Sequence, residues 1–90
     1  MKLSGDLLEE YKQKGWNPYA KPLHEWLRDV KHIHVNISPY SEDIPNGDLN
    51  ILWEYEIISL KDLELLSMQD GFTSHEDALN QSLIKIITLI

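Results

Sequence analysis

Hydrophobic residues recur at helical spacing near the start of the chain. Between residues 6 and 14 an apolar face is followed by Gly15, a typical helix stop. A second segment begins after Pro22, which suits the first turn of a helix. Its apolar residues follow the i, i+3, i+4, i+7 spacing: Leu23, Trp26, Leu27 and Val30. The pattern therefore predicts two amphipathic helices in the first third of the chain.

The middle of the chain changes to an alternating pattern that predicts β-strands. In residues 32–38 every second residue is apolar, with Ile33, Val35 and Ile37 on one face. A second strand is predicted over about residues 50–59 and a third over residues 63–69, although the leucine-rich start of the third would also suit a helical turn. Residues 39–49 contain two prolines, an Asn-Gly pair and three acids, and are predicted to form a loop.

The last segment predicts a third helix that packs onto a sheet. Ser74 and Asp77, or Thr73 and Glu76, have the spacing of a capping box before a helix that begins at His75. Its apolar stripe consists of Leu79, Leu83, Ile86, Ile87 and Ile90. Short connections between the strands favour an antiparallel arrangement. We expect a single α+β domain over residues 1–90, with a three-stranded antiparallel sheet, helices on one of its faces and the order αα-βββ-α.

Charge and composition exclude several classes of function. Fifteen acidic and eight basic residues give a net charge of −7, which disfavours binding to nucleic acid or to an anionic membrane. The chain has no cysteine, which excludes thiolate catalysis and thiolate metal sites. It shows no secretory signal pattern and no run of about 20 apolar residues. We expect a cytoplasmic protein that needs no cofactor and binds neither nucleic acid nor membranes.

Two small constellations could carry chemistry. His32 and His34 form a His-x-His pair whose side chains would project from one face of a strand, and Glu54 or Glu56 across the hairpin could supply an oxygen ligand to a metal ion. Paired carboxylates are also the groups that glycoside hydrolysis uses, but that chemistry needs a deep cleft. One hypothesis is therefore a small metal-dependent enzyme that uses these four residues. The alternative is a solvated sheet face with no metal and no catalytic residues.

Apolar residues on a face that should be polar favour a different function. Leu52 and Ile58 alternate in phase with Glu54 and Glu56, so the four residues should share the face away from the helices. An exposed surface of this kind is typical of a protein interface. We interpret the chain as a non-enzymatic interaction or adaptor module that binds another protein or a second copy of itself. A further alternative is an acidic mimic of nucleic acid, if Glu42, Asp43, Asp48, Glu54 and Glu56 gather on one surface.

Residues 70–79, Asp-Gly-Phe-Thr-Ser-His-Glu-Asp-Ala-Leu, carry a resemblance to other proteins. They resemble the strand-to-helix junction of small uncharacterised bacterial proteins of phages and mobile elements, and the passage from Trp26-Leu27-Arg28 to residues 32–35 is similar to the same group. That resemblance implies an αβββα-type fold and no particular activity. The junction is also similar to that of the HicB-type antitoxin domain, which implies an antitoxin-like role.

Overall fold

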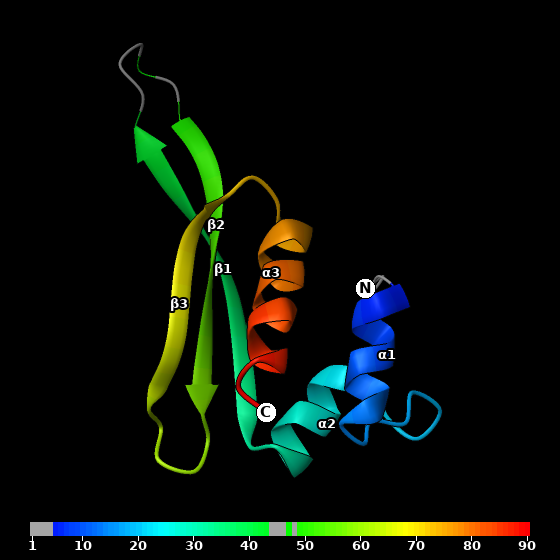
Figure 1. Ribbon diagram of the computed structural model, residues 1–90. Helices are drawn as coiled ribbons and strands as arrows, with labels where there is room; N and C mark the ends of the chain where they lie inside the picture. The colour runs from blue at the N-terminus through cyan, green and yellow to red at the C-terminus, as the bar shows by residue number, and fades with distance from the viewer. Residues whose placement is uncertain (1–4, 44–46, 48) are drawn as a thin grey trace.

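The computed structural model describes residues 5–43, 47 and 49–90. Two helices, α1 (Gly5–Gln13) and α2 (Leu23–Val30), precede the strands β1 (Ile33–Asp43), β2 (Leu49–Ser59) and β3 (Leu65–Phe72). The helix α3 (His75–Ile87) follows the last strand. The helices lie on one side of the sheet (Figure 1). The predicted α+β class and the αα-βββ-α order are confirmed.

The sheet is an antiparallel meander with the strand order β1-β2-β3. In the first hairpin the register runs without interruption from Ile33 opposite Ser59 to Asp43 opposite Leu49. The prediction of a loop over residues 39–49 is wrong, because residues 39–43 extend β1 and Leu49 already belongs to β2. The composition of residues 39–43 is typical of a loop, but pairing with β2 supplies hydrogen bonds that local propensity does not register. Residues 44–46 and 48 of the predicted loop lie outside the described residues.

The third strand exists but begins later than the pattern predicts. Leu63 has a φ of 57°, a left-handed conformation that an L-residue adopts in turns and not in strands. The backbone N–H of Glu64 donates to Oδ1 of Asp62 at 3.2 Å, which closes the same turn. Gly71 lies beyond the predicted end of the strand at residue 69, but it belongs to β3 and has a φ of 87°. The strand therefore covers residues 65–72 in place of 63–69.

The core lies between the helices and one face of the sheet. Ile57 of β2 is fully buried there, and the Tyr11 hydroxyl of α1 donates to the carbonyl of Leu83 in α3 at 2.5 Å. Val30 is 51% exposed, so the predicted apolar face of α2 is wrong at its last position. The buried apolar residues are Leu7, Tyr11, Trp16, Leu23, Trp26, Leu27, Ile33, Tyr55, Ile57, Ala78, Leu83 and Ile86.

The start of α3 follows the sequence signal. Ser74 is the N-cap, and its Oγ accepts a hydrogen bond from the Asp77 backbone N–H at 3.0 Å. Leu83 and Ile86 of the predicted stripe are buried, as are the small residues Ala78 and Ser82. Small side chains at these positions let the helix approach its neighbours closely. This packing places α3 against the sheet beside β1, where it forms one wall of a groove.

Candidate interaction surfaces

The sheet has one face that no helix covers in the described part of the chain; we call it the open face (Figure 1). Tyr55 and Ile57 of β2 are buried on the helical side, so the alternate residues of β2 project to the open face. Directly opposite residues of neighbouring strands share a face. The open face therefore includes the following pairs: Tyr40 with Leu52, Ser38 with Glu54, Asn36 with Glu56, His34 with Ile58, Leu65 with Ile58, and Met68 with Glu56.

The four residues singled out in the sequence come together on the open face. Leu52, Glu54, Glu56 and Ile58 are all partly exposed. Sequence reasoning missed Leu65 and Met68, which extend the apolar surface and are 50% and 52% exposed. The β2–β3 pairing shifts register in two places, so the face that each residue of β3 occupies does not follow from simple alternation.

The centre of the open face carries negative charge. Glu54 accepts a hydrogen bond from the Ser38 hydroxyl at 3.3 Å, and Glu56 lies opposite the neutral Asn36. Neither carboxylate forms an ion pair with a residue that the structure describes. Glu42 lies further along the same face of β1, opposite Asn50. Asp48 and the side chain of Asp43, the other acids considered for a nucleic-acid mimic, lie outside the described residues.

The two histidines proposed as metal ligands do not project from one strand. His32 lies before β1 with a φ of 57°, whereas His34 lies within the strand. The prediction that they share a strand face is therefore wrong, because the left-handed backbone at His32 makes the turn from α2 into the sheet. Within the described residues no group of three or more histidine, aspartate or glutamate side chains is arranged to hold a metal ion.

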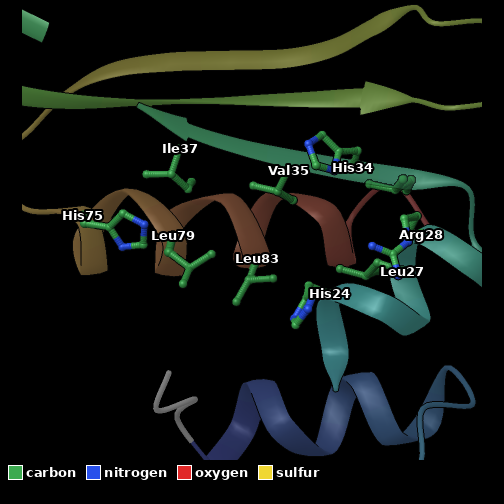
Figure 2. A pocket seen from close by; sticks show the side chains of 10 residues that line it. His24, Leu27, Arg28, His34, Val35, Ile37, His75, Leu79 and Leu83 are labelled. Atoms are coloured by element: carbon green, nitrogen blue, oxygen red, sulfur yellow. The ribbon is translucent and has the colours of Figure 1, made fainter. Parts of the chain in front are cut away.

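A groove of about 370 Å³ lies between β1, α2 and α3 (Figure 2). Its walls are mainly aliphatic, and its rim carries nitrogen-containing side chains; the lining residues are His24, Leu27, Arg28, Ile33, His34, Val35, Ile37, His75, Leu79 and Leu83. Figure 2 shows His75 at the first turn of α3, at one end of the groove, and His24 and Arg28 on α2 at the other. No local sequence pattern indicates this groove, because its residues come from three elements separated along the chain.

Electrostatics at the α2 end of the groove centre on Asp29. Its carboxylate accepts from Nε of Arg28 at 3.3 Å and from Nζ of Lys21 at 3.4 Å. The hydrogen bond from Arg28, together with that from Lys21, holds the pKa of Asp29 below its usual value. Two cations, Arg28 and Lys21, therefore share the carboxylate of Asp29.

The comparisons with known proteins add no relative. The chain matches no protein-family model, no curated protein and no solved structure. Within the described residues, every helix is too short or too polar to cross a membrane.

Proposed function

We propose that this protein is a non-enzymatic interaction module that binds another protein through the open face of its sheet. The observation that carries the proposal is the composition of that face. Leu52, Ile58, Leu65 and Met68 surround two carboxylates that have no cationic partner in the described part of the chain. An apolar surface that includes unpaired negative charge favours a partner that covers the apolar side chains and neutralises the carboxylates.

The apolar part of the open face supplies the driving force for association. Each square ångström of apolar surface removed from water is worth about 25 cal/mol. Leu65 and Met68 are each about half exposed and lie on the strand next to Ile58, so a partner can cover them together. The apolar residues of the open face thus resemble the core of an interface, with polar residues of β1 such as Asn36 along one side.

The charge at the centre favours a different protein over a second copy of this chain. A symmetric face-to-face pair would bring Glu54 and Glu56 of both copies into one layer, and like charges placed opposite each other across an interface are destabilising. A partner with lysine or arginine among its apolar contacts would form ion pairs there instead. The protein is therefore proposed to be a monomer that recognises a basic, partly apolar surface.

The test compares two double variants with matched substitutions. Leu52→Glu/Ile58→Glu changes the open face, whereas Val30→Glu/Ile84→Glu makes the same kind of change at two exposed residues of α2 and α3. Tagged proteins are used to capture partners from a lysate of the source cells, with quantitative mass spectrometry as the readout. We expect the open-face variant to lose at least about 90% of a captured partner and the control to retain it. Circular dichroism and urea denaturation show whether both variants fold.

Two outcomes would contradict the proposal. A partner that binds a folded open-face variant as well as it binds wild type would place the interface elsewhere. Self-association of wild type in light-scattering chromatography, lost in the open-face variant, would show that the occupant is a second copy. As a check on charge, Glu54→Gln/Glu56→Gln is expected to weaken partner binding and to reduce its dependence on salt.

A further inference from the structure

The strand β1 has one edge that pairs with no other strand in the described part of the chain. The backbone N–H of Leu60 donates to the carbonyl of His32 at 2.7 Å, which fixes the phase of the β1–β2 ladder. In this phase the odd-numbered residues of β1 direct their N–H and C=O groups away from β2. The backbone N–H and C=O groups of Val35 and Ile37 therefore lie at the free edge and point away from β2, and no described residue forms a hydrogen bond with them.

Pro39 limits the length of this free edge. It occupies the next odd-numbered position of β1, where the missing N–H would also have pointed away from β2. The ladder to β2 is therefore undisturbed, but an added strand finds no donor there. Proline is one of the devices that block unwanted pairing at sheet edges. The donors at Val35 and Ile37 remain available, and these two residues line the groove.

The groove continues the free edge on the helical side of the sheet. Val35 and Ile37 form its strand wall, and Leu79 and Leu83 of α3 also line it (Figure 2). The residues of an added strand that lie opposite Val35 and Ile37 would share their face and enter the groove. A volume of about 370 Å³ lies within the range of ligand pockets, at its lower end. The groove thus fits two apolar side chains spaced two residues apart.

The rim of the groove favours an acidic ligand. Arg28 and His24 lie toward its α2 end, and His75 lies at the other end with its ring edge-on to Trp53 at 5.2 Å between centroids. None of the described residues that line the groove is acidic, although the whole chain has a net charge of −7. Asp29, just outside the lining, already accepts from both Arg28 and Lys21. A carboxylate near Arg28 would gain a cation without an opposing acid in the groove wall.

We propose that the free edge of β1 and the groove beside it bind an extended peptide, which adds to the sheet as a fourth strand. The peptide carries two apolar side chains two residues apart, and an acidic residue that lies at the α2 end. Backbone hydrogen bonds to Val35 and Ile37 hold it in place, as in other cases of strand addition. This site is separate from the open face, and its test does not depend on the function proposed there.

Fluorescence anisotropy with short labelled peptides tests the proposal. Asp-Asp-Ile-Thr-Val-Thr and Thr-Val-Thr-Ile-Asp-Asp place the acid at either end and so cover both strand directions. We expect at least one to bind at concentrations of about 10–1000 µM, and its counterpart with lysine in place of aspartate to bind at least about tenfold more weakly. In a second pair of peptides either the apolar residues or the threonines carry N-methyl amides. N-methylation of one set of residues should abolish binding, and N-methylation of the other set should not. The reason is that only alternate amides of a strand face the neighbouring strand.

Variants of the protein locate the site. Leu79→Trp fills the groove and should weaken binding at least about tenfold. Arg28→Glu should reverse the preference from the aspartate peptide to the lysine peptide, whereas Lys14→Glu, the same charge change at an exposed residue after α1, should leave it unchanged. The open-face variant Leu52→Glu/Ile58→Glu should bind the peptide normally. Circular dichroism verifies that each variant folds.

The proposal is overturned if no acidic peptide binds, or if both methylated peptides bind as well as the parent. It is also overturned if folded Arg28→Glu keeps the preference for aspartate. Binding of octanoate alone, without any peptide, would show that the groove takes a small apolar anion and that the strand edge has no part in recognition.

Discussion

The buried phenol of Tyr11 gives the sharpest test of the packing between the helices. The residue is fully buried, its ring lies edge-on to Trp16 at 6.5 Å between centroids, and its hydroxyl donates to the Leu83 carbonyl. This hydrogen bond joins α1 to α3, which are separated by most of the chain. Tyr11→Phe keeps the ring and removes the donor. We expect it to lower the free energy of unfolding by about 1 kcal/mol at neutral pH.

The effect should disappear at alkaline pH. Burial raises the pKa of the Tyr11 hydroxyl well above its ordinary value, and the nearby Glu10 carboxylate raises it further. A raised pKa stabilises the folded state fully below the pKa of the unfolded state, which is about 10, and this stabilisation is lost as the pH rises. At about pH 11 ionisation stabilises the unfolded wild-type chain by roughly 1.4 kcal/mol, while the phenylalanine variant gains nothing. The two proteins should then have nearly equal stability.

Urea denaturation of both proteins at about pH 7, 9 and 11, followed by tryptophan fluorescence, measures this difference. Other ionisable groups are common to both proteins and cancel in the comparison. Tyr19 is 97% exposed, so Tyr19→Phe serves as the matched control and should change stability at none of these pH values. A Tyr11→Phe penalty that stays constant from neutral to alkaline pH would refute the burial argument. No penalty at neutral pH would refute the hydrogen bond.

Two further stability predictions concern α3 and the core. Ser74→Ala removes the hydroxyl that accepts from the Asp77 N–H and should lower the free energy of unfolding by about 0.5–2 kcal/mol, measured by urea denaturation. Ser74→Gly should lower it by only a few tenths of a kcal/mol. Trp26→Ala and Leu83→Ala truncate residues that are 6% and 2% exposed, and each should lower the free energy of unfolding by about 2–5 kcal/mol. Unchanged denaturation midpoints for both would show that these side chains do not belong to the core.

The candidate surfaces differ in how far the sequence predicts them. The open face follows from alternation along β2, because Leu52, Glu54, Glu56 and Ile58 keep one phase and their face depends only on where the helices pack. The groove does not follow from any local pattern. His24, His34 and His75 lie far apart in the sequence and line one cavity only because α2 and α3 both pack beside β1.

The features of this protein that its sequence predicts correctly are local ones. The period of the apolar residues indicated helices around Trp26 and Leu83 and a strand around Val35, since side-chain direction repeats with a fixed period in each element. Ser74 marked the start of α3, because a cap is formed by neighbours in the chain. The tertiary structure decided the rest. Pairing with β2 turned residues 39–43 into strand against their loop-like composition, and the meander left the far edge of β1 unpaired beside α3. These outcomes depend on hydrogen bonds and packing between segments distant in sequence, which a local pattern does not encode.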